Sequence, residues 1–501
     1  MRVEPATVAC VRDLIRSSAW TARLELSEDD RDRMVSGVDA LSSAMAAGDR
    51  IYGVTQGFGP LVRFRPDNSS ADVGMGLISH LAAGQGAPLS PAVTRLMVWF
   101  RLEGMKRGHS AVSPDRWLEL ARLWNLGFTP VVPREGSLSA SGDLAPLAHA
   151  ALAFAGIGDA WSPAGTTPPE PLPAASALDE LGAEPFAWNA REALAFVNGT
   201  SASLALSCHN HAATGTMARA AAALTGRIAW LLGCNSEPYA EQLALVRGHA
   251  GHLRASEWIR SEIAAGPGDG ARPIQEPYSL RCAPQVIGAV LEQLHMQEAT
   301  LVQEASGCTD NPVVVGGRIL HGGNFHALGP ALASDQLALC VHQLAFLAER
   351  QLAILLDPAQ NGGLPPMLTP SPGRASGLAG VQLSASSLVA RIRQLSSPAT
   401  LTALPTNLGN QDIVPMALNG ANAVAESIEL AWLVVGSLTI AVLQLSYLQH
   451  ERRRSPDHDI NGIWDDLQAS YRPLVEDRPL ATEVREAAEA MREKAERLRT
   501  S

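Results

Sequence analysis

The apolar and polar residues of this chain follow helical spacing over most of its length. Residues 335–356, DQLALCVHQLAFLAERQLAILL, place apolar side chains at steps of three and four and keep the charges to one side. Residues 201–233 are rich in Ala, Ser and Thr, a composition that lets neighbouring helices approach closely. Residues 481–500 pair Glu with Arg at helical spacing and predict an amphipathic terminal helix. Since no run of short alternating strands interrupts these segments, the pattern predicts a mainly α protein made of long bundled helices.

One apolar segment is nearly long enough to span a membrane. Residues 430–448 read LAWLVVGSLTIAVLQLSYL, and no second segment resembles them. The segment still contains Ser437, Thr439, Gln444 and Ser446. A helix that is apolar on all sides is also what the centre of a large bundle requires, so we interpret this segment as a buried core helix.

Length, composition and charge limit the class of protein. The 501 residues suggest several domains at the usual ~150 residues each, although one large helical core can absorb the same length. With 46% hydrophobic and 18% charged residues, the chain is globular and neither disordered nor collagen-like. The formal net charge of -11 repels phosphate backbones and argues against a nucleic-acid partner.

The cysteines and the first residues indicate a cytoplasmic protein. Six cysteines are spread thinly over the chain, whereas a secreted disulfide scaffold crowds them into a short one. The first residues, MRVEPATVACVRDL, carry acidic side chains and lack the apolar stretch of a signal peptide.

A proline-rich stretch divides the chain into two parts. Residues 162–176, SPAGTTPPEPLPAAS, contain five prolines and form the clearest linker. They separate a Gly-punctuated N-terminal portion from a long helical C-terminal portion. We therefore expect a smaller, loop-rich domain over residues 1–197 and a long-helix bundle domain over residues 198–501.

Several sequence patterns that could indicate a cofactor or metal site are weak evidence for one. Residues 266–271 match the letters G-x-G-x-x-A, but they follow a helical segment and contain a proline, which disfavours a dinucleotide cradle. Residues 208–211, Cys-His-Asn-His, lack the spacing of a tetrahedral metal site. His249 and His252 lack an H-E-x-x-H frame, so we interpret these histidines as capping or core residues. A metal hydrolase and a nucleotide-dependent enzyme therefore have little support.

Two Gly-rich segments are candidates for catalytic loops. Residues 52–60, YGVTQGFGP, put a phenol beside three glycines, which suit a mobile loop that closes over a substrate. Residues 136–149, GSLSASGDLAPLAH, contain Ala-Ser-Gly at residues 140–142. Because the same tripeptide recurs at residues 305–307 and 375–377, only the surroundings can select one copy.

Those surroundings resemble the ammonia-lyases and aminomutases of histidine, phenylalanine and tyrosine, whose electrophile is a self-made methylidene-imidazolone (MIO). The resemblance extends in order over nearly the whole chain. Its motifs are YGVTQGFG, SLSASGDLAPLAH, FVNGTS, QEPYSLR, CTDNPV, GGNFHA and NQDIVPMA. It implies the long-helix bundle of the histidase and phenylalanine ammonia-lyase type, with the MIO in the N-terminal domain.

The resemblance implies covalent catalysis without a metal or a nucleotide. In the family an Ala-Ser-Gly backbone cyclises and loses water, so Ala140, Ser141 and Gly142 would build the MIO and Ser141 would supply the methylidene carbon. The substrate amine adds to this carbon and becomes a better leaving group. Small residues at 139–142 permit the compressed backbone that cyclisation needs.

The resemblance also assigns roles around the MIO. Tyr52 matches the tyrosine that takes the β-proton, and the site must lower its pKa from the ordinary ~10 for that purpose. Arg281, in QEPYSLR, matches the arginine that grips the substrate carboxylate. The other matched residues surround the MIO, the amine or the ring, with Tyr278 among the catalytic ones: Gly59, Leu81, Asn198, Gln275, Tyr278, Phe325, Asn407 and Gln411.

The residues after the Gly-rich loop favour tyrosine as the substrate. His80 and Leu81 resemble the His-Leu pair of tyrosine ammonia-lyases, and phenylalanine enzymes typically have an apolar residue in place of His80. Histidine enzymes shift Ser-His by one position and carry Glu where this chain has Gln411. We expect a buried His80 imidazole to face the para position of L-tyrosine, which would be converted to trans-4-hydroxycinnamate (p-coumarate) and ammonia.

Two departures from the family pattern leave the choice between lyase and aminomutase open. Thr55-Gln56 replaces the commoner Asn-Thr or Thr-Thr, and residues 413–415, Ile-Val-Pro, follow NQD. The alternatives are therefore a tyrosine 2,3-aminomutase and a phenylalanine or histidine ammonia-lyase. A catalytically silent helical scaffold is a further alternative, but it should have lost the tyrosine or the tripeptide.

The resemblance also implies a homotetramer whose active sites are shared between subunits. We expect Tyr52 and Arg281 to come from different chains. Apolar helices such as residues 430–448 agree with this, since they imply a core larger than one chain readily covers. No membrane or nucleic-acid partner is expected.

Overall fold

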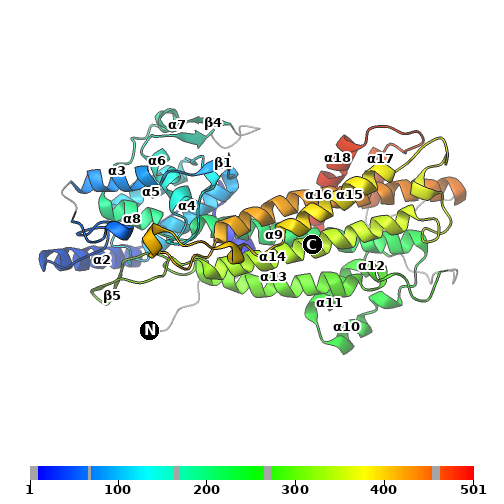
Figure 1. Cartoon of the computed structure of the whole chain (residues 1–501), viewed down its shortest axis with the longest axis horizontal. Helices are drawn as coiled ribbons and strands as arrows, with labels where there is room; N and C mark the ends of the chain where they lie inside the picture. The colour runs from blue at the N-terminus through cyan, green and yellow to red at the C-terminus, as the bar shows by residue number, and fades with distance from the viewer. Residues whose placement is uncertain (1–9, 66–68, 163–169, 264–271, 454–462, 501) are drawn as a thin grey trace. The chain divides into compact units, whose positions relative to one another are not determined.

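The chain forms a mainly helical fold made of two compact units, seen here in a computed structural model (Figure 1). The described residues are 10–65, 69–162, 170–263, 272–453 and 463–500, so the Gly-rich residues 266–271 lie outside them. Unit 1 comprises Met1–His209, Gln297–Asp335 and Pro398–Asn422, and unit 2 comprises Asn210–Met296, Gln336–Ser397 and Ala423–Ser501. Unit 1 thus includes two later segments that a single boundary after residue 197 assigns to the helical part.

Unit 1 is built from helices with well-defined starts. The hydroxyls of Ser27, Ser69, Ser90 and Ser113 each accept a backbone N–H from the first turn of the helix that follows. The helices are α1 (Val11–Ser17), α2 (Glu28–Ala46), α3 (Ser70–Leu81), α4 (Pro91–Lys106), α5 (Pro114–Asn125), α6 (Leu144–Phe154), α7 (Ala174–Glu180) and α8 (Ala190–Val197). Short 3₁₀ turns at Gly59–Leu61, Ala399–Thr402 and Asn407–Gly409 lie in its loops.

The described strands form only two-stranded antiparallel ladders. They pair β1 (Gln85–Pro88) with β2 (Pro133–Glu135), β3 (Asp159–Trp161) with β4 (Pro171–Pro173), and β5 (Val313–Val315) with β6 (Arg318–Leu320). Strand β2 directly precedes the Gly-rich loop at residues 136–143, so the β1–β2 ladder fixes where that loop begins.

The long helices predicted from the sequence pattern are present. Four of the described helices begin or end in unit 1 and extend through unit 2: α9 (Ser201–Leu232), α13 (Ala283–Ala305), α14 (Leu328–Leu356) and α16 (Ala417–Arg453). Unit 2 also contains α10 (Glu241–Arg247), α11 (Ala250–Arg260), α12 (Tyr278–Arg281), α15 (Ala379–Leu395), α17 (Ile463–Ser470) and α18 (Ala481–Thr500), with 3₁₀ turns at Glu237–Tyr239 and Pro366–Leu368. The predicted mainly α, long-helix architecture is confirmed.

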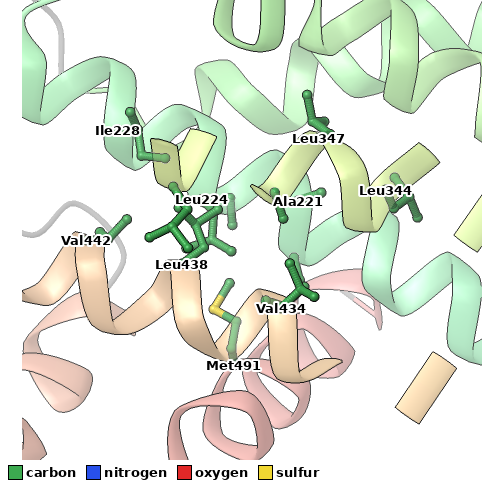
Figure 2. Close-up of a cluster of buried hydrophobic side chains, with 14 of the residues drawn as sticks. Ala221, Leu224, Ile228, Leu344, Leu347, Val434, Leu438, Val442 and Met491 are labelled. Atoms are coloured by element: carbon green, nitrogen blue, oxygen red, sulfur yellow. The ribbon is translucent and has the colours of Figure 1, made fainter. Parts of the chain in front are cut away.

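The core of unit 2 lies where four of these helices meet. Figure 2 shows one buried cluster with side chains from each of them, including Leu224 of α9, Leu344 of α14, Leu438 of α16 and Met491 of α18. Gly436 lets α16 and α18 touch, because a Cβ there would lie 2.3 Å from the carbonyl oxygen of Val484. Close packing of this kind gains dispersion energy that a gap would forfeit.

Two described helices are long and apolar enough to cross a membrane by length and composition, Leu328–Leu356 and Ala417–Gln449. In their most apolar windows 67% and 83% of the residues, respectively, are buried within the fold, as in the core helices of a globular protein. This burial agrees with the interpretation of residues 430–448 as a core helix. The expectation that no second segment resembles them is wrong.

Candidate active site

A cavity of about 1070 Å³ in unit 1 gathers residues that lie far apart in the sequence. It is bordered by the Gly-rich loop after Tyr52, by α3, by the first residue of α6 and by the loop around Asn407. The matched residues that line it are Tyr52, Gly59, His80, Leu81, Ser141, Asn198, Phe325, Asn407 and Gln411. Ala140 is buried just before Ser141, and Gly142 is buried just after it.

The tripeptide lies in a tightly compressed loop ahead of α6. The φ of Ser139 is +54° and that of Gly142 is +71°, and Ala140 and Gly142 form a local β-bridge across Ser141. A Cβ on Gly142 would lie 2.4 Å from both the nitrogen and the oxygen of Gly199. Only glycine fits a left-handed position against another backbone in this way. The loop therefore holds the two ends of the tripeptide close together.

The buried carboxylate of Asp143 fixes the conformation of this loop through hydrogen bonds. Asp143 is fully buried, and its Oδ1 accepts hydrogen bonds from the hydroxyls of Ser137 at 3.1 Å and Ser139 at 2.7 Å. Its Oδ2 accepts from the backbone N–H of Ser203 at 2.7 Å and from the Ser203 hydroxyl at 2.8 Å. Burial raises the pKa of Asp143, and these donors oppose that shift. The carboxylate thus ties both sides of the loop to the start of α9.

Two amide side chains contact Ser141 inside the cavity. The Nδ2 of Asn198 donates to the Ser141 carbonyl at 2.7 Å, and the Nε2 of Gln411 donates to the Ser141 hydroxyl at 2.9 Å. Gln411 is itself oriented by the Thr406 hydroxyl, which donates to its Oε1 at 2.7 Å. The Oδ1 of Asn198 is buried and has no hydrogen-bond partner within the described chain. An unpaired acceptor therefore lies beside Ser141 and can receive a hydrogen bond from a ligand.

The other two Ala-Ser-Gly copies lie in different surroundings. The Ser306 hydroxyl donates to the carbonyl of Val302 at the end of α13, as in an ordinary helix terminus. At residues 375–377 the backbone N–H groups of Ser376 and Gly377 donate to the Asp477 carboxylate at 2.8 to 3.0 Å. The backbone N–H of Gly377 is therefore already paired in that copy.

Tyr52 lies on the cavity with its hydroxyl fixed by the backbone. The Gly59 N–H donates to the Tyr52 oxygen at 2.8 Å, and the Tyr52 N–H donates to Nε2 of His321 at 3.1 Å. Burial raises the pKa of Tyr52, which the bond from Gly59 only partly opposes, and no charged side chain of the described chain contributes. The lowered pKa expected from the sequence is therefore absent in the single chain, because no cation is near enough to favour the phenolate.

His80 stands at the last turn of α3. It lines the cavity and is exposed, so the expectation of a buried imidazole is wrong for the single chain, where this end of the cavity is open. Its Nδ1 lies 3.0 Å from the carbonyl oxygen of Gly76. Because a carbonyl can only accept, Nδ1 donates this bond and leaves Nε2 as an acceptor. The ring is thus prepared to receive a hydrogen bond from a hydroxyl.

Three of the matched residues belong to unit 2 instead. Gln275, Tyr278 and Arg281 lie at or just before α12, and none of them lines the cavity of unit 1. Tyr278 borders a different cavity of about 600 Å³ and is 71% exposed. The Arg281 guanidinium lies 4.9 Å from the centre of the Tyr278 ring and forms no ion pair within the described chain. An unpaired guanidinium remains available for a carboxylate.

Sequence reasoning missed the residues that support the loop and the tyrosine. Asp143 and Gly199 lie within two of the recognised motifs, yet only the fold shows that they hold the tripeptide. His321 opens the run HGGNFH, and no spacing rule links it to Tyr52. Among the described residues, no group of three or more His, Cys, Asp or Glu side chains could hold a metal ion.

Comparison with known proteins gives consistent matches. Residues 7–466 match the family model described as aromatic amino acid lyase. Tyrosine aminomutase from Streptomyces globisporus is similar in structure, with 28% identity, a TM-score of 0.89, and coverage of 99% of this chain and 97% of that chain. Histidine ammonia-lyase from Trypanosoma cruzi is 26% identical, with a TM-score of 0.85 and coverage of 97% and 92%. Phenylalanine ammonia-lyase from the yeast Rhodosporidium toruloides shares the fold. It is 22% identical, with a TM-score of 0.77 and coverage of 97% of this chain and 82% of that chain.

Proposed function

This chain belongs to the aromatic amino acid lyase family and is a carbon–nitrogen lyase, and we propose that its reaction is the conversion of L-tyrosine to p-coumarate and ammonia. The observation that carries the proposal is one cavity lined by Ser141, Tyr52 and His80. These residues would serve the amine end, the β-carbon and the ring hydroxyl of such a substrate, respectively. A cytoplasmic location remains a prediction from the cysteine pattern.

The loop around the tripeptide suits an MIO built from Ala140, Ser141 and Gly142. The left-handed Gly142, packed against Gly199, keeps the two ends of the tripeptide near each other, as ring closure requires. Ser141 is the member of the tripeptide that lines the cavity. The group would supply an electrophilic carbon for the substrate amine, which ordinary side chains, being nucleophiles and acids or bases, cannot provide.

The polar groups beside Ser141 suit an amino group. A substrate ammonium can donate to the free Oδ1 of Asn198, while Gln411 holds the position of Ser141. Tyr52 would take the β-proton through its hydroxyl, which the Gly59 N–H already orients. Since the pKa of Tyr52 is raised in the single chain, the reaction needs a nearby cation, and we propose that Arg281 of a partner subunit supplies it while binding the substrate carboxylate.

The first prediction concerns the substrate ring. In His80→Phe the acceptor at Nε2 is lost, so the tyrosine hydroxyl would lose its hydrogen-bond partner on the protein, and the ratio of kcat/KM for tyrosine to that for phenylalanine should fall about tenfold or more. Steady-state kinetics with both amino acids measure the ratio. His295→Phe, an exposed histidine of α13, is the matched control and should leave it unchanged. A ratio that does not move in His80→Phe would remove the main support for tyrosine.

The second prediction concerns the carboxylate behind the loop. Asp143→Ala leaves Ser137, Ser139 and Ser203 without their common acceptor, so the loop should lose the geometry that ring closure needs. Because a displacement of an ångström can cost about a hundredfold in rate, we expect most purified chains to lack the MIO. Intact mass, which falls by one water per MIO, and near-ultraviolet absorbance both report this. A wild-type content of MIO in Asp143→Ala contradicts the role.

The alternative reaction is a tyrosine 2,3-aminomutase, favoured by the similarity to the aminomutase from Streptomyces globisporus. It uses the same residues but returns the ammonia to the β-carbon. Incubation with tyrosine, phenylalanine and histidine, followed by product analysis, separates the possibilities. We expect p-coumarate and free ammonia from tyrosine, whereas β-tyrosine as the main product would assign the aminomutase reaction.

A further inference from the structure

Unit 2 contains a small polar cavity that the proposed function does not explain. It has a volume of about 200 Å³ and lies where α10 and the first turn of α11 meet α13. Glycines bring α11 and α13 into contact, because a Cβ on Gly251 would lie 2.3 Å from the Gly288 carbonyl oxygen. The side of the cavity formed by α11 is therefore held firmly against α13.

Two residues of the lining carry buried polar atoms without partners. His252 is 3% exposed, and its Nε2 lies 3.1 Å from Nε2 of Gln285. Since the amide nitrogen can only donate, the imidazole accepts at Nε2 and carries its own proton at Nδ1. Neither this Nδ1 nor Oε1 of Gln285 has a hydrogen-bond partner within the described chain. The lining thus offers one unpaired donor and one unpaired acceptor, each of which needs a partner.

Two charged side chains, Arg247 and Glu292, line this cavity beside His249. Arg247, at the end of α10, and His249, just before α11, line it and are exposed, and Arg247 has no ion-pair partner in the described chain. Burial, together with the fields of Arg247 and His249, lowers the pKa of His252 and keeps its ring neutral. The carboxylate of Glu292 also lines the cavity, and it accepts the Gly251 N–H at 2.7 Å. The positive end of the α11 dipole adds to the attraction for an anion.

We propose that this cavity binds a single phosphate group in its hydrogen phosphate form. Its charged oxygens would accept hydrogen bonds from the Arg247 guanidinium and from Nδ1 of His252, and its hydroxyl would donate to Oε1 of Gln285. Sulfate and carboxylates have no hydroxyl to donate at neutral pH, so they leave the Gln285 oxygen unpaired. The volume accommodates one such group but not a nucleotide.

Calorimetric titration of the full-length protein with inorganic phosphate tests the proposal. We expect saturable binding to a single site per chain, with sulfate weaker by about tenfold or more at matched ionic strength, because it cannot donate to Gln285. Glycerol phosphate is the second probe. Tighter binding of it assigns the site to the phosphate ester of a small molecule, and tighter binding of inorganic phosphate assigns it to the free ion.

Variants separate this site from a general attraction of the helix for anions. Arg247→Gln changes an exposed side chain, so the fold should survive while phosphate binding weakens about tenfold. Arg254→Gln is the control, because Arg254 is exposed on α11 and pairs with Glu257 at 3.0 Å, away from the cavity lining. It should bind as the wild type does. Absence of saturable binding, equal binding of sulfate, or unchanged binding in Arg247→Gln would overturn the proposal.

Discussion

Ser141→Ala should abolish activity, lowering kcat by several orders of magnitude, while leaving the fold intact. The substitution removes the one hydroxyl from which the methylidene carbon of the MIO would be made. In the chain before ring closure, the substitution removes only one hydrogen bond from Gln411, worth about 1 kcal/mol, because the bond from Asn198 goes to the backbone carbonyl. Activity, intact mass and near-ultraviolet absorbance should therefore change together, and thermal unfolding should hardly change.

The chain provides its own controls for this experiment. Ser306→Ala and Ser376→Ala change the same residue in the same tripeptide at places that do not line the cavity. Both variants should keep wild-type activity, and their intact masses should still be lower by one water than the masses calculated from their sequences. Full activity in Ser141→Ala, or a wild-type mass without any loss of water, would refute an MIO at residues 140–142. Inactivity of Ser376→Ala would mean that a different copy of the tripeptide forms the group.

Tyr52→Phe and Arg281→Met should each be inactive alone and should restore activity when the two are expressed together. The expectation follows from the division of the site, because Tyr52 lines the cavity of unit 1 whereas Arg281 lies in unit 2 with no carboxylate partner in the described chain. Each change removes a group that acts on every turnover, so each variant alone should lose several orders of magnitude in kcat. If sites are shared between subunits, about one quarter of the sites in a random mixture combine two wild-type residues.

Exposed apolar side chains agree with such an assembly. Leu401, Leu404 and Leu408, in the segment that contains the cavity-lining Asn407, are 80%, 70% and 95% exposed, respectively, in the single chain. Light scattering should accordingly report a tetramer. A fully active monomer, or failure of the co-expressed variants to regain activity, would show that each chain builds its own site. As a control, co-expression of Tyr52→Phe with Ser141→Ala tests whether Tyr52 and Ser141, which line one cavity in the same chain, also act within one chain.

Helices were predictable from the sequence because their causes are local. The apolar spacing in residues 201–233, 335–356 and 481–500 depends on neighbours three and four positions away, and each segment forms a helix in the structure. The burial of residues 430–448 was also predictable, because a helix without a polar face must be covered. The bundled helices and the family motifs needed no knowledge of distant contacts.

The geometry of the site depends on contacts that the sequence does not encode locally. Motif resemblance pointed to residues 140–142, but the reason that this copy is compressed lies in the backbone of Gly199 and in the carboxylate of Asp143. The exposure of His80 and the raised pKa of Tyr52 likewise follow from what packs around them in the single chain. These properties differ from the sequence-based expectation, because burial and charge are set by residues distant in the chain.

The sequence by itself determined the helical architecture, the family and the identities of the candidate catalytic residues, since periodicity and motif order are written along the chain. Only the tertiary structure decided which of those residues meet. It gathers Tyr52, His80 and Ser141 on one cavity and leaves Arg281 in another unit. The physical reason is that a helix is stabilised by contacts within a few residues, whereas a catalytic site requires side chains from separate segments to be held within hydrogen-bonding distance of one another.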